Sequence, residues 1–202
     1  MQLSTQGLAD DAQRRRRQLT ADAIELAALD LFHQRPYEQV TAADIAEAAR
    51  VSVRTFYRYF PSKQDLLLAL PRRYASRIAE ATQGRPAKER GFAAVRAAIE
   101  ELSTVDDPEL RQWQGAVALG AEGDRMAQLV VSVTSPILSQ ALARRAHRGK
   151  DDAWAEIGGA LIATALTLGA RRWATSGGSL RTHVLAAVDI VGSGLLPPHK
   201  PR

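Results

Sequence analysis

Three predicted helix starts follow one another between positions 41 and 62, and this spacing constrains the fold more than any other feature of the sequence. Thr41, Ser52 and Ser62 are hydroxyl residues of the kind that cap helix N-termini. Thr41 is followed three residues later by Asp44, which resembles a capping box with aspartate in place of the usual glutamate. Only residues 49–51 then separate the first two short helices, which is helix-turn-helix spacing.

The composition favours helices along the whole chain. Alanine, leucine and arginine dominate, and aromatic residues make up only 5% of the sequence. A chain of 202 residues has room for one or two small domains with a sizeable core. We therefore predict an all-α fold with helical patterns at 13–34, 41–49, 53 onward, 62–82 (bent at Pro71), 87–104, 108–121, 123–147, 151–176 and 179–195.

Several kinds of chemistry have no residues to carry them. The sequence contains no cysteine, which excludes disulfides and thiolate metal sites. Its four histidines are scattered, and none pairs with a second ligand at a metal-site spacing. Nucleophile-elbow, phosphate-loop and dinucleotide motifs are also missing from the sequence. We therefore predict no catalytic residues, no metal and no cofactor, and an all-helical enzyme remains the less favoured alternative.

The protein is predicted to stay in the cytoplasm and to have no membrane partner. The first residues, MQLSTQGLADD, do not have the basic-then-apolar layout of a signal peptide. The longest uncharged apolar stretch of note, 157–170, has 14 residues, whereas a membrane span needs about 20. That stretch is predicted to be a buried helix.

Positive charge is concentrated in two short stretches. The formal net charge is +5, but residues 1–70 hold nine basic and nine acidic side chains. Within that neutral segment, Arg14 to Arg17 are consecutive, and residues 50–63 carry four basic groups and no acidic one. Arg14 and Arg15 are candidates to follow a phosphate backbone or to enter a minor groove. The alternative is that the run is a solvated, frayed helix start.

The stretch VSVRTFYRYFPSK has the layout of a helix that reads DNA. Phe56 and Phe60 are four residues apart and would anchor the helix to its domain, which leaves an exposed arc for base edges. Arginine has the fork geometry to read guanine, and helix N-termini favour phosphates. The candidate contacts are Val53, Arg54, Tyr57 and Arg58 for bases, and Thr41, Ser52, Thr55, Tyr59, Ser62 and Lys63 for the backbone. The alternative is a set of solvated residues on a small helical bundle.

The segment PYEQVTAADIAEAARVSVRTFYRYFPSKQDLL resembles the DNA-binding domain of the TetR family of repressors nearly end to end. The T-x-x-D-I-A start, the V-S-x-x-T-F-Y-x-Y-F helix and the S-K-x-x-L entry to the next helix carry the resemblance, which covers roughly residues 14–70. It implies a three-helix domain that binds double-stranded operator DNA. It also implies backbone contacts from Thr41, Ser52, Thr55, Tyr59 and Lys63, and base contacts from Val53, Arg54, Tyr57 and Arg58.

Two positions depart from the family pattern, which has glycine where this chain has Pro36 and Arg50. Pro36 cannot take a positive φ, so the loop after the first helix must be built differently. Arg50 is expected either to adopt a left-handed conformation at some energetic cost or to reach a phosphate.

The last two helical patterns carry small and apolar side chains, which allow close helix packing. Residues 151–176 are rich in glycine and alanine, including Gly159 and Gly169. The resemblance implies that these two helices form a two-fold homodimer interface, which suits a palindromic operator. The alternative is that they only complete the core of one subunit.

The middle of the chain supplies candidates for enclosing a small-molecule effector. They are Trp113, Gln114, Val117, Met126, Val130, Val133 and Trp154, and each is also compatible with an ordinary core position. The segments DPELR (107–111) and RRWATSGGSL (171–180) resemble the sensor half of regulators related to the mycofactocin repressor. That resemblance implies an apolar, acyl-type ligand.

These expectations give four regions: a disordered arm (1–13), the DNA-binding domain (14–70), a helical ligand-binding and dimerisation domain (71–196) and a tail (197–202). The expected function is a repressor whose dimer leaves its operator when a small apolar ligand binds. A helix from Ser62 to Thr82 is expected to belong to both domains and to transmit the change. An activator with the same fold and a ligand-independent DNA-binding protein are the alternatives.

Overall fold

The computed structural model describes residues 5–89, 91–102, 121–149 and 151–194, and every regular element in these ranges is a helix. The predicted all-α fold is therefore confirmed. The chain divides into two compact units, Met1–Leu67 and Leu68–Arg202. This boundary lies close to the predicted division at residue 70. The predicted helix at 108–121 and the tail at 197–202 fall outside the described residues, apart from Ala121.

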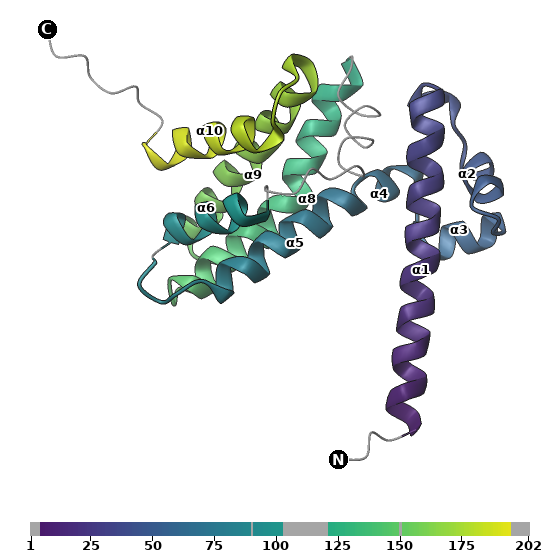
Figure 1. Ribbon diagram of the computed structural model, residues 1–202, viewed down its shortest axis with the longest axis horizontal. Helices are drawn as coiled ribbons and strands as arrows, with labels where there is room; N and C mark the ends of the chain where they lie inside the picture. The colour runs from purple at the N-terminus through teal and green to yellow at the C-terminus, as the bar shows by residue number, and fades with distance from the viewer. Residues whose placement is uncertain (1–4, 90, 103–120, 150, 195–202) are drawn as a thin grey trace, which may run out of the picture. The chain divides into compact units, whose positions relative to one another are not determined.

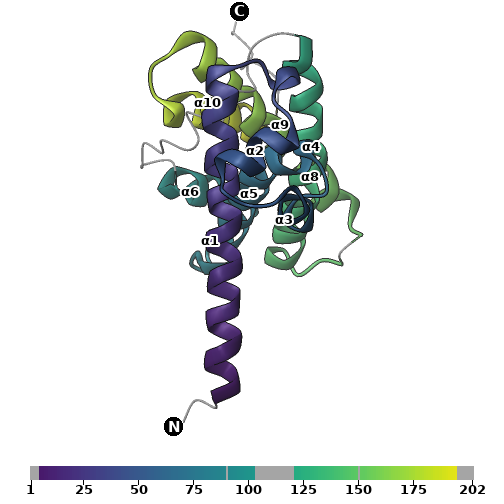
Figure 2. The same cartoon turned by 90° about the vertical axis from the view of Figure 1, so that its right-hand side faces the viewer.

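The first unit is a small bundle built on one long helix. It comprises α1 (Thr5–Gln34), the 3-10 helix η1 (Tyr37–Gln39), α2 (Ala42–Ala48), α3 (Val53–Tyr59) and α4 (Lys63–Leu67). Helices α2 and α3 lie beside the C-terminal half of α1 (Figures 1 and 2). Its core contains Ile24, Ala28, Phe32, Val40, Ile45 and Phe56, each at most 5% exposed.

Helix α1 begins earlier than the sequence pattern predicts. Residues 5–13, predicted to belong to a disordered arm, form the first turns of the helix. Every residue from Asp10 to Leu19 is exposed, and burial begins only near Ile24. The apolar spacing used for the prediction marks the packed half of the helix, so it carries no information about the exposed half. At 1.5 Å per residue, the exposed stretch from Asp10 to Leu19 alone is about 15 Å long.

All three predicted caps are present in the helix-turn-helix. Thr41 and Asp44 form a complete capping box, and the Ser52 hydroxyl accepts from the Thr55 amide at 3.0 Å. The Ser62 hydroxyl accepts from the Asp65 amide at 3.0 Å. These local hydrogen bonds fix where each short helix begins, because they satisfy amides that have no partner inside the helix.

The turn between α2 and α3 is a Schellman motif centred on Arg50. The Val51 amide donates to the Ala46 carbonyl at 2.9 Å, and the Arg50 amide donates to the Glu47 carbonyl at 3.0 Å. This arrangement requires a left-handed residue, and Arg50 has a φ of 55°. The left-handed conformation, one of the two alternatives predicted for Arg50, is therefore observed.

The single helix predicted over 62–82 is wrong. Helix α4 ends at Leu67, and α5 (Ala69–Gly84) begins after Leu68. Pro71 explains the position of the break, because a proline lacks the amide hydrogen for the carbonyl four residues earlier and its ring clashes with that carbonyl. The carbonyl belongs to Leu67, so the helix breaks at Leu68 while Pro71 itself sits in the tolerated first turn of α5.

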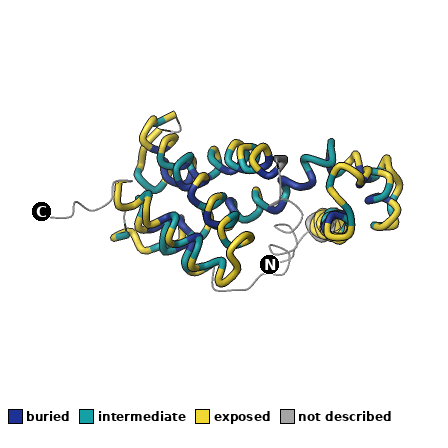
Figure 3. The backbone as a smooth tube through the Cα atoms, turned by 90° about the horizontal axis from the view of Figure 1, so that it is seen from above, coloured by how far each residue is buried: buried dark blue, intermediate teal, exposed yellow. Residues whose placement is uncertain are grey.

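The second unit contains α5, α6 (Gly91–Leu102), α8 (Ala121–Arg145), α9 (Ala153–Ser176) and α10 (Leu180–Gly192). Its buried residues gather where these helices face one another (Figure 3). The Arg145 guanidinium near the end of α8 donates to the Arg85 and Glu89 carbonyls at 2.8 and 2.9 Å. The side-chain amide of Gln83 donates to the Ala141 carbonyl at 2.9 Å. The C-terminal end of α5 is therefore tied to α8 at several points.

Two of the small residues of α9 are used within the subunit. A Cβ built on Gly159 would lie 2.5 Å from the Ser139 amide nitrogen of α8. A Cβ on Gly169 would lie 2.8 Å from the Val184 Cα of α10. The expectation that the small residues serve a partner subunit is therefore corrected for these two glycines, which permit close packing of α9 against α8 and α10.

Two described helices, Gly123–Arg145 and Ala153–Ser176, are long and apolar enough to cross a membrane by length and composition alone. Core helices of soluble proteins meet the same criterion, so this is weak evidence. The stretch 157–170 belongs to the second of them. It was predicted to be buried, but only part of it is. Ile162 and Ala163 face the core, whereas Ile157 and Leu168 are 60% and 49% exposed.

Candidate nucleic-acid interface

Helix α3 separates its anchoring residues from its exposed ones as the spacing predicts. Phe56 is fully buried and Phe60 is 7% exposed, and their ring centroids lie 6.2 Å apart. Val53 and Tyr57 are 41% and 52% exposed, although residues of these types are usually at least partly buried. The candidate base contacts Val53, Arg54, Tyr57 and Arg58 are all exposed. The bundle therefore presents two arginines and an aromatic ring on one short helix, a set that can donate to base edges.

Three of the candidate backbone contacts, Thr41, Ser52 and Ser62, use their hydroxyls as helix caps. The Thr41 hydroxyl accepts from the Asp44 amide at 3.1 Å and also stabilises the ionised Asp44 carboxyl. The hydroxyls of Ser52 and Thr55 lie 2.9 Å apart and share one hydrogen bond. One hydroxyl hydrogen of this pair is therefore left to donate to a phosphate.

Asp44 is ionised by its place in the cap. The Thr41 backbone amide and hydroxyl lower the pKa of the Asp44 carboxyl, with a smaller contribution from Arg35, whose guanidinium lies 3.8 Å away. The cap is thus strongest when Asp44 carries its negative charge.

The Lys63 side chain makes contacts within the first unit. Its ammonium donates to the Tyr37 and Val40 carbonyls at 2.5 and 2.7 Å and lies 3.9 Å from the centroid of the Tyr37 ring. Partial burial lowers the pKa of Lys63, although the Glu38 charge opposes this effect. These contacts join the residues of η1 and the residue before the α2 cap to the first residue of α4. They use two of the three ammonium hydrogens, so a phosphate contact from Lys63 stays a prediction.

Arg50 is exposed, and its backbone conformation projects it from the turn between α2 and α3. The other departure from the family pattern, Pro36, has a φ of −50° and begins the 3-10 helix η1. The loop after α1 is thus built around a short helix, where glycine would allow a different turn.

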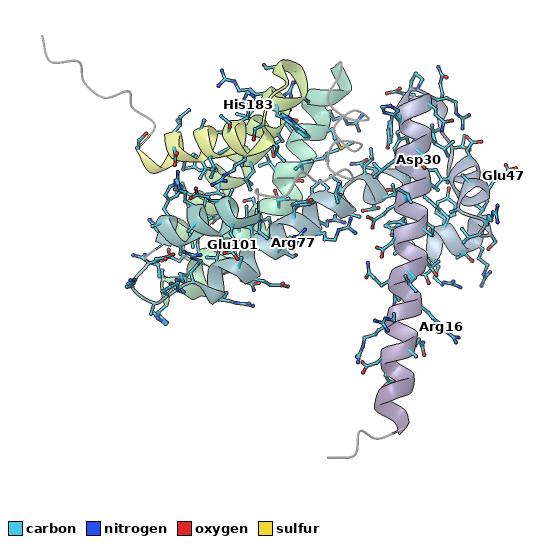
Figure 4. The ribbon with its side chains drawn as sticks, viewed as in Figure 1. Arg16, Asp30, Glu47, Arg77, Glu101 and His183 are labelled. Carbon is cyan, nitrogen blue, oxygen red and sulfur yellow. The ribbon has the colours of Figure 1, made fainter. Side chains whose placement is uncertain are left out.

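The arginine run lies on the exposed part of α1, where Figure 4 also shows the Arg16 side chain. Arg14 forms an ion pair with Asp11 one turn earlier. The Arg17 guanidinium carbon lies 6.0 Å from the centroid of the Tyr59 ring, and the Arg58 guanidinium carbon lies 5.3 Å from the same centroid. Sequence reasoning listed Arg14 and Arg15 as candidates, but the structure brings Arg17 to the recognition helix. Tyr59 is 42 positions further along the chain, so no local pattern could reveal this contact.

The candidate effector residues fall into three groups. Trp113, Gln114 and Val117 lie outside the described residues. Met126 and Val130 are each 7% exposed and share one face of α8, and Val133 on the same helix is half-buried. Trp154 is 46% exposed at the start of α9 and lies beneath Arg148, whose guanidinium carbon is 5.2 Å from the ring.

Trp154 lies far from Met126 and Val130, the candidate effector residues on α8. Trp154 lies just after the loop that follows α8, whereas Met126 lies about 28 Å along α8 from the end at Arg145. The expectation of a shared lining is corrected for Trp154, whose place is set by the cap of α9 rather than by a cavity.

Helices α9 and α10 also carry an exposed apolar face. Ile157, Leu168 and Ile190 are 60%, 49% and 50% exposed. A shallow groove of about 450 Å³ runs between the two helices, and it is lined by Leu161, Thr164, Ala165, Leu168, Arg171, Arg172, Thr175, Ala187, Ile190 and Val191. Single exposed leucines are common on soluble proteins, but here several exposed apolar side chains lie together on α9 and α10.

Comparison with known proteins places the first unit in a described family of sequences. The family model for bacterial regulatory proteins of the tetR family matches residues 24–70. The transcriptional regulator TcmR of Streptomyces glaucescens is 36% identical over 99 residues, which cover 48% of this chain and 44% of TcmR. The chain thus spans less than half the length of this relative.

Two further relatives extend over most of the chain. MftR of Mycobacterium tuberculosis, whose name assigns it to regulation of mycofactocin biosynthesis, is 26% identical over 191 residues, 90% of this chain and 93% of MftR. Thermus thermophilus FadR, a TetR family repressor solved with lauroyl-CoA, matches with a TM-score of 0.52 and 22% identity over 90% of this chain and 98% of FadR. The likeness to FadR, which covers 90% of this chain, shows the fold and nothing finer.

Proposed function

Because this chain belongs to the TetR family of bacterial regulatory proteins, we propose that it is a transcriptional repressor whose dimer binds a palindromic operator in the cytoplasm. A small apolar molecule releases it from the DNA. The observation that carries the proposal is the division of α3 into buried phenylalanines and an exposed arc of Val53, Arg54, Tyr57 and Arg58.

Helix α3 enters the major groove, where its arginines read guanine and its apolar surface contacts thymine methyl groups. The DNA backbone on either side of the groove is contacted by Thr41, by one hydroxyl of the Ser52–Thr55 pair and by Arg50. These contacts set the position of the helix in the groove, and the base contacts supply the sequence preference.

A second copy of the chain covers the apolar face of α9 and α10. A palindromic operator needs two recognition helices related by a two-fold axis, and a self-complementary helix pair supplies that symmetry. Leu168→Glu puts a charge in the middle of this face and is expected to yield monomers by sedimentation. Leu19→Glu is the matched control, because Leu19 is also an exposed leucine, at 63%, but lies on α1. Dimers that persist in Leu168→Glu would refute this interface.

The effector binds beside the buried Met126 and Val130 of α8. Several hydrogen bonds tie α8 to the end of α5, so a ligand that displaces α8 also displaces α5. The first residues of α5 follow directly on the DNA-binding unit. Coupling of this kind is commonly about 1–3 kcal/mol, which corresponds to roughly a 5- to 150-fold loss of operator affinity.

The first experiment measures binding of the purified protein to the duplex upstream of its own gene and to a scrambled duplex of the same composition. We expect a clear preference for the upstream duplex, lost in Arg54→Ala and Tyr57→Ala, each of which removes about 1–3 kcal/mol of base discrimination. Gln18→Ala, a polar change on an exposed part of α1, is the control. Lauric acid and lauroyl-CoA are the probes for release. Failure to prefer any duplex, including those obtained by random-sequence selection, would refute the repressor function.

A further inference from the structure

The exposed part of α1 carries four consecutive arginines that cannot all face the same surface. Successive residues of an α-helix are rotated by about 100°, so Arg15 points to the side opposite Arg17, and Arg16 points to a third side. Arg14 shares the face of Arg17 but is already paired with Asp11. One arginine of the run is therefore distinguished from the others by its surroundings.

Arg17 meets the recognition helix through an aromatic ring. Its guanidinium carbon lies 6.0 Å from the Tyr59 ring centroid, and the guanidinium carbon of Arg58 lies 5.3 Å from it. Within the described part of the chain, neither Arg17 nor Arg58 forms an ion pair. Two unneutralised guanidinium groups held by one ring form a site for an anion.

We propose that the Arg17–Tyr59–Arg58 stack is a DNA-backbone clamp, in which Arg17 binds a phosphate flanking the bases that α3 reads. The inference rests on the proposed function and narrows the arginine run to one contact residue. Tyr59 is a positioning residue, because its ring holds both guanidinium groups and reduces the rotamer entropy that Arg17 loses on binding a phosphate. The ring matters for this role, and the Tyr59 hydroxyl does not.

The proposal predicts a sequence-independent effect, unlike that of the base contacts. Each phosphate contact changes the slope of log affinity against log salt concentration by about 0.9. In the full-length protein, Arg17→Ala is expected to lower the slope by about that amount and to weaken binding about five- to tenfold on the upstream and scrambled duplexes alike. The ratio of the two affinities stays constant, whereas Arg54→Ala lowers the ratio.

The matched control is Arg16→Ala, which removes the same charge one residue away on a different side of α1. Its salt slope is expected to stay close to that of the unchanged protein. Tyr59→Leu removes the ring and is expected to reproduce the loss seen in Arg17→Ala, and Tyr59→Phe, which keeps the ring, is expected to lose less of the salt slope than Tyr59→Leu does. The double change Arg17→Ala with Tyr59→Leu should then add little to either single change. Circular dichroism melts of all variants show whether the bundle is intact.

The outcomes separate this inference from the proposed function. Equal effects of Arg17→Ala and Arg16→Ala would overturn the clamp, because the run would then act only as diffuse charge. An unchanged slope in Arg17→Ala, with selectivity still lost in Arg54→Ala, would also overturn it and leave the repressor function in place. If the unchanged protein shows no preference for any duplex, the slopes measured on the scrambled duplex still decide whether Arg17 contacts phosphate.

Discussion

Replacing Arg50 with glycine should raise the stability of the protein and lower its affinity for DNA. Arg50 holds the left-handed position of the Schellman turn between α2 and α3, with a φ of 55°. A side chain with a Cβ costs about 1–2 kcal/mol in that conformation. Glycine removes this cost but loses about 0.5–1 kcal/mol through the greater freedom of the unfolded chain. The net gain expected for Arg50→Gly is about 0.5–1 kcal/mol.

The variant Arg50→Ala separates the backbone effect from the charge effect. Alanine keeps the Cβ in the left-handed conformation but removes the guanidinium, so it should gain no stability. Because Arg50 is exposed, neither substitution removes buried packing. Both variants should bind DNA more weakly by the same factor, and both should lower the slope of log affinity against log salt concentration by about 0.9, the value for one phosphate contact.

Urea unfolding and DNA-binding anisotropy measure the two effects in the same samples. A gain of 0.5–1 kcal/mol corresponds to roughly 1–4 °C in melting temperature for a chain of this size. If Arg50→Gly is no more stable than Arg50→Ala, the positive φ is not strained and the argument fails. If both variants bind DNA as tightly as the unchanged protein, Arg50 makes no phosphate contact.

Three other changes test the packing and the caps. Gly159→Ala should cost about 1–3 kcal/mol of stability in urea unfolding because its Cβ would overlap the Ser139 backbone, whereas Gly158→Ala meets only the end of a leucine side chain and should be tolerated. Asp44→Asn should be less stable than the unchanged protein at neutral pH. Since the folded pKa of Asp44 is lowered, this difference should shrink as the pH falls through that pKa, and acid unfolding curves that stay parallel would contradict it. Lys63→Met should cost about 1–3 kcal/mol of stability in urea unfolding, because it leaves the Tyr37 and Val40 carbonyls without their ammonium donor.

The helix-turn-helix was predictable from the sequence because its determinants are local. The caps at Thr41, Ser52 and Ser62 each act within three residues, and the sequence shows both partners of every cap. The left-handed conformation of Arg50 was predictable only from the resemblance to the TetR family, which has glycine at this position. The exposure of Tyr57 followed from the four-residue spacing of the phenylalanines that flank it.

Contacts between distant parts of the chain account for most of what the sequence did not predict. The ammonium of Lys63 is bound by carbonyls 23 and 26 positions away, and nothing in its neighbourhood indicates that it turns inward. The glycines of α9 show that a helix can be approached closely, but the sequence does not say by which helix. The position of the helix break was missed for a different reason, because Pro71 acts on a carbonyl four residues before it.

The break at Leu68 also bears on how regulators of this kind diversify. Since the backbone ladder of α4 does not continue into α5, a recombination event at this junction need not preserve a helical phase between the two units. A chimera that joins residues 1–67 to the sensor of another regulator keeps every cap and every α3 anchor described above. The same proline that ends one helix therefore marks a junction at which a chimera can be joined without altering the caps of the first unit.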